Sequence, residues 1–477
     1  MDAASLFAQT KFPELGQSDW RKLAEKALAG ASFDALVSRT DDGIGIDPHA
    51  SRAKGATAWT RGNPAERWII TQRVDDPDPT RANRQALEDI EGGATGLSLV
   101  FEGAPNAFGY GLPADPDSLR KVLEGIQFTK THLRIDVHPS SRASVDWLVA
   151  ALTAKRIDPT KLSLAFGIDP AAIFAGTGRL RMSIEALKAS MPQSLAHFFA
   201  LDVPGVLVEA DGRVFHNAGA TEAQELGILL ATAVSHLRMF EEARQPLVYA
   251  APHIGFALSV DQDQFLSMAK IRALRKLWTR VQEACSIEAV PCAIHAETSY
   301  RMLSFKDPET NILRSTIAAF AAGVGGADSI SILPHTLSHG LPDAFARRVA
   351  RNTHAILTGE SHVDHVADPI AGAGSVEALT NALCERAWVE FQRLEAEGGV
   401  LESLVAGKLQ DRVVAARGGR AARYSSGERA IIGTTKFPAA KERPVAVLET
   451  QRRPTPEEGV VFCTPLQALR IDETIAS

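Results

Sequence analysis

The stretch Leu97-Ser98-Leu99-Val100-Phe101 is a short apolar run with the length of a buried β-strand, and a helical pattern that starts near Asp115-Pro116 follows it. Seven further runs of this kind lie along the chain between longer helical segments. Such alternation is typical of βα units with a parallel sheet, and eight of them predict a TIM (β/α)8 barrel, an α/β fold. The eight runs are Leu97–Phe101, Leu133–Val137, Leu162–Phe166, Val206–Glu209, Leu247–Ala250, Pro291–His295, Ser329–Leu333 and Val363–Ala367.

The strongest helical pattern between these runs covers Asp261 to Cys285. Its apolar residues repeat at helical spacing, which predicts a helix with one face in the core. The residues on that face are Phe265, Met268, Ala269, Ile271, Leu274 and Leu277.

A segment at each end of the chain lacks the alternation of strand and helix patterns that predicts the barrel. Residues 1–65 contain a glycine-punctuated stretch at 42–48 and predict an extended N-terminal arm that contacts another subunit. The barrel is expected over residues 66–373, and residues 374–477 predict a C-terminal helical linker region. Within that region, Arg417-Gly418-Gly419-Arg420 is interpreted as a loop.

The composition excludes several classes of protein. With 477 residues, 45% hydrophobic and 23% charged, the chain can form a large packed core. A net charge of -6 offers no basic surface for nucleic acid, and no apolar stretch reaches the ~18 residues of a membrane span. The N-terminus has no cationic leader, and the four cysteines lack paired spacing, so we expect a cytoplasmic protein without disulfides or zinc.

Several motifs occur together along the chain. None of them is specific for a protein family by itself, but their order and spacing are. They are Trp59-Thr60-Arg61-Gly62, Trp68-Ile69-Ile70-Thr71-Gln72-Arg73, Gly92-Gly93-Ala94-Thr95-Gly96-Leu97-Ser98, Asn217-Ala218-Gly219-Ala220-Thr221, Ile294-His295-Ala296-Glu297-Thr298-Ser299 and Ile432-Gly433-Thr434-Thr435-Lys436. From about residue 34 to about residue 470 the chain therefore resembles the methylmalonyl-CoA mutase family. The resemblance implies a barrel with coenzyme A along its axis and a separate flavodoxin-like domain that presents cobalamin at the barrel mouth.

Cobalamin domains of this family carry Asp-x-His-x-x-Gly. Both Asp-x-His occurrences here, at 47–49 and 136–138, lack the glycine, and the segment Cys463 to Arg470 resembles the linker that leads into such a domain. Because the sequence ends at Ser477, we expect adenosylcobalamin to be carried by a partner chain. No residue of this chain is expected to bind the cofactor or a metal.

Two catalytic positions of the family are altered in this sequence. The tyrosine of the Trp-x-x-x-Gln-Tyr motif corresponds to Arg73, whose guanidinium stays charged and is costly to bury unpaired. The family's thioester-binding histidine corresponds to Val214 in an ungapped alignment, or to His216 if two residues are deleted. We therefore expect no catalytic residue here, and the family's substrate-contacting glutamine corresponds to Gly167.

The family's His-x-Gln-x-Ser-Gly motif, which faces the ribose of coenzyme A, is nearly retained. His295, Glu297 and Ser299 are therefore candidates for vestigial coenzyme A contacts. His295 is expected at the C-terminal end of a barrel strand, where barrel enzymes collect their active-site groups.

The resemblance thus implies the small, non-catalytic subunit of a heterodimeric, adenosylcobalamin-dependent mutase of this family. Its large partner would hold the acyl-CoA and interconvert methylmalonyl-CoA and succinyl-CoA by radical rearrangement, so that the complex is an isomerase. One alternative is a catalytic barrel that uses a separate cobalamin-binding subunit. Another is an unrelated barrel lyase or aldolase, for which Asp136, Glu209 and His295 are the acid–base candidates.

Overall fold

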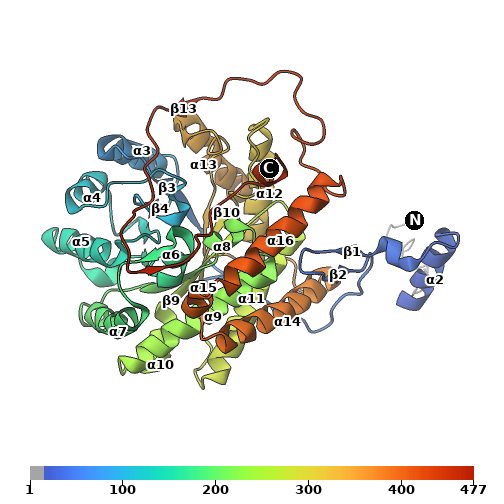
Figure 1. Cartoon of the computed structure of the whole chain (residues 1–477), viewed down its shortest axis with the longest axis horizontal. Helices are drawn as coiled ribbons and strands as arrows, with labels where there is room; N and C mark the ends of the chain where they lie inside the picture. The colour runs from blue at the N-terminus through green and yellow to red at the C-terminus, as the bar shows by residue number, and fades with distance from the viewer. Residues whose placement is uncertain (1–15, 477) are drawn as a thin grey trace, which may run out of the picture.

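The computed structural model describes residues 16–476, and its centre is an eight-stranded parallel β-barrel surrounded by helices (Figure 1). The strands pair in the order β6-β5-β4-β3-β11-β10-β9-β8, and a parallel bridge between Ala165 and Val206 joins the two ends. The predicted TIM-type α/β barrel is confirmed. Its strands are β3 (Ile69–Val74), β4 (Gly96–Leu99), β5 (His132–Ile135), β6 (Leu164–Phe166), β8 (Val208–Asp211), β9 (Ile254–Val260), β10 (Ala293–Thr298) and β11 (Ser329–Ser331).

The helices pack their apolar faces on the outside of the barrel and form one large core with it. Three of them start at an aspartate that caps the first turn and is followed by proline: Asp78, Asp115 and Asp169. The surrounding helices are α3 (Pro79–Glu91), α4 (Pro116–Val122), α5 (Ser141–Ala154), α6 (Pro170–Thr177), α7 (Ile184–Ala200), α9 (Glu222–Glu242), α11 (Gln264–Ala284), α12 (Thr310–Gly325) and α13 (Ala344–Gly359).

Two of the eight predicted strand runs are wrong. Leu247–Ala250 forms a short helix, α10, and Val363–Ala367 forms no strand. Val248, Tyr249 and Val366 are 47%, 68% and 57% exposed, so these apolar residues lie at the surface. The two remaining positions in the barrel belong to β3, which overlaps the Trp68-to-Arg73 motif and ends at Val74, and to β9, which follows α10 after a short 3-10 turn (Ala251–His253).

Helix α11 confirms the predicted core-facing helix, except that Phe265 is 55% exposed at its first turn. None of the helices in residues 16–476 is both long and apolar enough to cross a membrane.

Four helices follow the barrel in the described residues: α14 (Gly374–Ala396), α15 (Val400–Val405), α16 (Lys408–Ser425) and the short α17 (Ile471–Ala476). The loop predicted at Arg417-Gly418-Gly419-Arg420 is wrong, because these residues lie inside α16. The two glycines weaken a helix locally, but both arginines donate hydrogen bonds to backbone carbonyls of residues 218–220 and hold this turn against the barrel.

The last part of the chain crosses the face of the barrel where the strands end (Figure 1). We call residues 452–471 the strap. Its strand β14 (Val461–Phe462) pairs antiparallel with β7 (Arg179–Leu180). Four backbone N–H groups of the strap, those of Arg453, Leu466, Leu469 and Ile471, donate to the carbonyls of Gly109, Ala175, Asn217 and Arg301.

At the other end of the chain, α2 (Gln17–Ala27) lies to the side of the barrel (Figure 1) and has no buried residue. It is followed by a small hairpin of β1 (Ser38–Arg39) and β2 (Gly45–Ile46). In this hairpin, Asp41 forms ion pairs with Arg420 at 2.6 Å, with Arg429 at 3.1 Å and with Arg423. These pairs join the hairpin to α16 and to the loop after it.

Candidate functional site at the barrel mouth

Charged side chains from non-adjacent strands meet inside the barrel, at the C-terminal ends of the strands. Arg73 of β3 contacts Glu297 of β10 at 3.0 Å, although β11 lies between the two strands. Arg134 of β5 pairs with Glu209 of β8 across β6 in the same way. Both pairs therefore cross the interior, where barrel enzymes place their reacting groups.

Arg73 is the most heavily engaged of these groups. Besides Glu297, its guanidinium contacts the carboxylate of Asp75 at 3.3 Å and donates to the backbone carbonyl of Asn106 at 2.7 Å. Its side chain is 1% exposed. Burial lowers the pKa of Arg73, but Glu297 and Asp75 outweigh this effect and raise it above its ordinary value.

Arg213 forms the second centre of the network. It lies at the start of α8 (Arg213–Ala218), contacts Asp211 at 2.7 Å and Glu297 at 3.4 Å, and pairs with Asp136. Burial raises the pKa of Asp136, yet Arg213 and Arg134 overcome this effect and hold it below its ordinary value.

The charges of this mouth network nearly cancel. Its four arginines face five carboxylates, and each carboxylate has an arginine within ion-pair distance. A buried charge is tolerated when it is paired in this way. The members are Arg73, Arg134, Arg213, Arg347, Asp75, Asp136, Glu209, Asp211 and Glu297.

A column of rings and guanidinium groups continues from this network to the strap. The guanidinium of Arg73 lies over the ring of Phe108, which stacks on the ring of Tyr300 at 4.3 Å, and Arg470 lies over the other end. Arg470 also contacts the Tyr300 hydroxyl at 3.2 Å. Cation–π and stacked contacts of this kind hold their members in place, so the column covers the buried guanidinium of Arg73.

The two candidates for the histidine position lie in different surroundings. Val214 is buried and lies beside Gly176 of α6. The ring of His216 contacts Ser299 Oγ through Nε2 at 2.9 Å and Glu225 through Nδ1 at 3.0 Å. Burial, Arg301 and Lys270 hold the pKa of His216 well below its ordinary value, so the ring stays neutral.

The three coenzyme A candidates all lie inside the barrel end, but at different depths. His295 does not end its strand as expected, because β10 continues to Thr298. Its ring contacts Ser329 Oγ at 2.8 Å, and burial together with Arg134 lowers its pKa well below the ordinary value. Glu297 belongs to the mouth network, and Ser299 contacts His216.

Several members of the site were missed in the sequence. The sequence predicted no role at the site for Arg134, Arg213, Phe108, Tyr300 or Arg470. One signal was present: His132 and Arg134 of β5 and Asp136 directly after it alternate with apolar residues, so polar side chains point to one face of a buried strand.

The fold and this mouth define the class: a TIM-type barrel whose active-site end is filled by paired charges. Residues 41–460 match the family model described as Methylmalonyl-CoA mutase. The chain belongs to the methylmalonyl-CoA mutase family.

Its curated relatives include several small subunits. It is 34% identical to the methylmalonyl-CoA mutase small subunit of Streptomyces virginiae, over 95% of this chain and 74% of that protein. It is 31% identical to the corresponding small subunit of Propionibacterium freudenreichii subsp. shermanii, over 91% of this chain and 70% of that one. A methylmalonyl-CoA mutase of Cereibacter sphaeroides is 27% identical, over 90% of this chain and 65% of that protein.

The mouth does not fit the cobalamin that the family implies. Arg73 stands where the resemblance places the corrin-facing tyrosine, and it is held by Glu297, Asp75 and Phe108. Above it, the strap occupies the face of the barrel through Leu469 and Arg470. A corrin at this mouth would displace the strap and the aromatic column.

Proposed function

We propose that this chain is the small, non-catalytic subunit of a heterodimeric, adenosylcobalamin-dependent methylmalonyl-CoA mutase. The observation that carries the proposal is the mouth network, in which Arg73 is neutralised by Glu297 and Asp75. Radical rearrangement requires a water-free pocket with the reacting groups in near-perfect position. A mouth filled by protein ion pairs offers no such space.

In this proposal, the large partner chain binds both the acyl-CoA and the cobalamin and carries out the isomerase reaction. This chain contributes a stabilising barrel (residues 66–373), an arm (1–65) that contacts the partner, and a C-terminal region (374–477). The arm helix α2 supports such a contact, since it has no buried residue and leaves Leu23 56% exposed. The four free cysteines are consistent with the reducing cytoplasm.

One observation favours the alternative, a catalytic barrel that uses a separate cobalamin-binding subunit. Four buried hydroxyl groups on barrel strands have no hydrogen-bond partner in the described part of the chain, as expected for the lining of a polar channel: those of Thr71, Ser98, Ser259 and Ser331. We place this second, because the mouth network lies at the end of any such channel.

Co-expression of this chain with and without its large partner separates the two functions. Each preparation is tested for bound cobalamin and for conversion of methylmalonyl-CoA to succinyl-CoA. We expect both only when the large chain is present. Turnover by this chain with only a cobalamin-binding subunit added would establish the alternative instead.

A matched pair of variants locates the active barrel. Arg73→Tyr restores the family residue in this chain. It weakens the fold by leaving Glu297 and Asp75 with one cation fewer, so turnover is measured on the complex that still assembles, and we expect that complex to keep its turnover. The reverse change, tyrosine to arginine at the corresponding position of the large chain, should abolish it. If Arg73→Tyr alone created activity in the isolated chain, a non-catalytic role would be untenable.

A further inference from the structure

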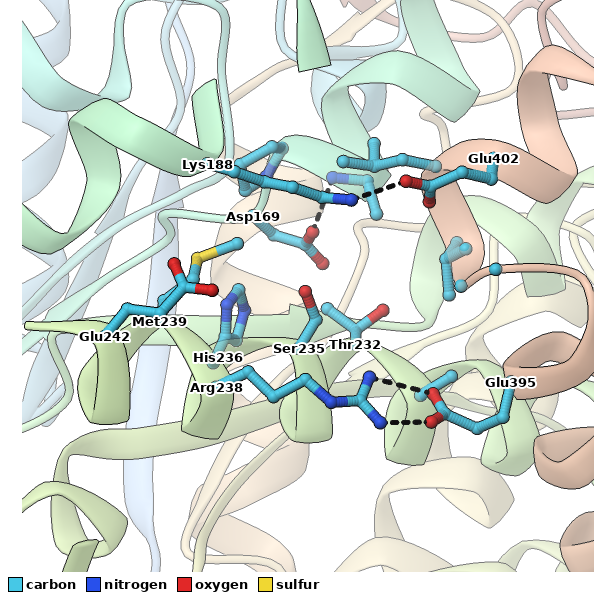
Figure 2. A pocket seen from close by; sticks show the side chains of 17 residues that line it. Asp169, Lys188, Thr232, Ser235, His236, Arg238, Met239, Glu242, Glu395 and Glu402 are labelled. Carbon is cyan, nitrogen blue, oxygen red and sulfur yellow. Dashed lines mark hydrogen bonds and ion pairs between the residues drawn. The ribbon is translucent and has the colours of Figure 1, made fainter. Parts of the chain in front are cut away.

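A second cavity lies outside the barrel, between α6, α7, α9 and the segment that joins α14 to α15 (Figure 2). Its volume is about 150 Å³, enough for a group the size of a benzene ring. Ala231, Met239 and Leu401 give it apolar walls. It contains none of the residues of the mouth network, and neither the barrel chemistry nor the family motifs explain it.

The floor of this cavity holds a carboxylate without a cation. Asp169 is fully buried, and it accepts hydrogen bonds from the backbone N–H groups of Ala171, Ala172 and Asp211. Among the described residues, no lysine, arginine or histidine forms an ion pair with it, in contrast to the carboxylates of the mouth network. Burial therefore raises the pKa of Asp169 to about 7.

A free acceptor lies beside this carboxylate. His236 is 1% exposed, and its Nε2 donates to the backbone carbonyl of Glu209 at 2.9 Å. Burial lowers the pKa of His236 to about 4, so the ring is neutral and Nδ1 carries a lone pair. That Nδ1 is buried and finds no hydrogen-bond partner in the part of the chain that the structure describes. In Figure 2 the carboxylate of Asp169 lies above the His236 ring, with Thr232 and Ser235 beside it.

The rim of the cavity is charged and already paired. Lys188 forms an ion pair with Glu402, and Arg238 forms one with Glu395 (Figure 2). Glu242 adds a further carboxylate that is exposed. The rim thus has two cations and three carboxylates, so its field attracts a cation and repels an anion.

We propose that this cavity binds a small primary amine, whose ammonium group donates hydrogen bonds to the carboxylate of Asp169 and to Nδ1 of His236. Its apolar part lies against Met239 and Leu401. An ammonium group supplies the donor that Nδ1 of His236 lacks. It also gives the carboxylate of Asp169, which accepts only from backbone N–H groups, a cation that neutralises it. A carboxylic acid would place a second negative charge beside Asp169.

The site can influence the mouth network, because both floor residues hold strand β8. Asp169 accepts the N–H of Asp211, and His236 donates to the carbonyl of Glu209. The side chains of Asp211 and Glu209 are members of the network on the other side of the same strand.

Calorimetric titration of the full chain with benzylamine tests the proposal, with benzyl alcohol and benzoate as matched neutral and anionic probes. We expect benzylamine to bind and the other two to bind at least about tenfold more weakly, the difference made by one charged hydrogen bond. Because ammonium binding requires ionised Asp169, the affinity should rise about tenfold from pH 6 to pH 8.

Two variants secure the assignment. Asp169→Asn keeps the size of the side chain and removes its charge, so benzylamine affinity should fall about tenfold and lose its pH dependence. Ala231→Leu fills the cavity and should abolish binding. This variant tests the site independently, also in the case that Asp169→Asn fails to fold. Equal affinity for benzylamine and benzyl alcohol, or unchanged binding in Ala231→Leu, would refute the amine site.

Discussion

At the scale of single residues, Arg73 is the most heavily engaged side chain of the mouth network. Its guanidinium is buried, and its partners are Glu297, Asp75, the carbonyl of Asn106 and the ring of Phe108. Arginine can satisfy so many partners because its donors form a rigid planar fork. The residue therefore stabilises the mouth network, and in the proposed function this is its role.

Replacing Arg73 by methionine should strongly destabilise the fold. The change leaves Glu297 and Asp75 buried with one cation fewer, and removing one partner of a buried pair costs about 3 to 5 kcal/mol. Urea denaturation, followed by circular dichroism, measures the free energy of unfolding. The matched control is Arg120→Met, whose ion pair with Asp117 is exposed and should contribute at most about 1 kcal/mol. Equal losses in the two variants would contradict the importance assigned to the network.

Because of Asp169, the free energy of unfolding should decrease as the pH rises, whereas a carboxylate with a lowered pKa would make it increase. Its pKa in the folded chain is about 7, above the ordinary 3.8, so the folded state holds the proton more tightly than the unfolded state. Its contribution is therefore complete below about pH 4 and is lost as the pH rises to about 7. In Asp169→Asn, we expect this loss to disappear, a difference of at most about 4 kcal/mol across the interval.

Urea denaturation of both proteins at several pH values measures this difference. Asp42 and Asp263 also have pKa values raised to about 6, but they are present in both proteins and cancel in the comparison. Parallel stability curves for the two proteins would show that Asp169 titrates normally.

At the scale of elements, the strap depends on close contact with the end of α6. Gly178 ends α6 with a φ of +74°, and its carbonyl accepts the N–H of Cys463 at 2.9 Å. A Cβ on Gly178 would lie 2.8 Å from the carbonyl oxygen of Cys463. Only glycine allows the strap to lie this close.

Gly178→Ala should therefore release the strap. Gly407 is the matched control, because its φ is +75° and a Cβ there would meet no atom within 4 Å. Both changes cost about 1 to 2 kcal/mol for the left-handed conformation. Only Gly178→Ala should also speed hydrogen exchange at the amides of residues 461–469. Similar exchange in both variants would mean that the strap does not depend on this contact.

Strands and helices were predicted correctly where a local residue pattern determines them. They were predicted wrongly where the structure depends on which residues are exposed. Six of the eight strand runs overlap barrel strands, because their apolar residues are buried between sheet and helices. Leu247–Ala250 has the same composition, but Val248 and Tyr249 face outward in a helix. The Arg-Gly-Gly-Arg turn was assigned to a loop from its glycines, and only its contacts with the carbonyls of residues 218–220 account for its helical structure.

At the scale of the whole molecule, the hairpin of the arm is tied to α16 and the loop after it through one carboxylate in a cluster of arginines. Asp41 pairs with Arg420, Arg423 and Arg429, which lie at the far end of the chain. Any arm that reaches a partner subunit is therefore anchored to α16.

Asp41→Asn should loosen the arm while leaving the barrel intact. Without the carboxylate, three arginines repel one another, so protease cleavage near residues 38–46 should become faster and the proposed complex about tenfold weaker. Limited proteolysis and sedimentation with the large chain measure these effects. Asp47→Asn, an exposed change on the same arm, is the control and should have no effect. Equal behaviour of the two variants would show that the Asp41 pairs do not hold the arm.

The sequence by itself determined the barrel class, the family and the presence of arginine at the tyrosine position, because these depend on local periodicity and on motif spacing. Only the tertiary structure decided what that arginine does. Glu297 is 224 positions away from Arg73, and Arg470 reaches the same column from the strap. Closure of the barrel brings these groups within a few ångströms, and burial then makes their pairing obligatory. The closed mouth is therefore a property of the folded chain that its local patterns do not contain.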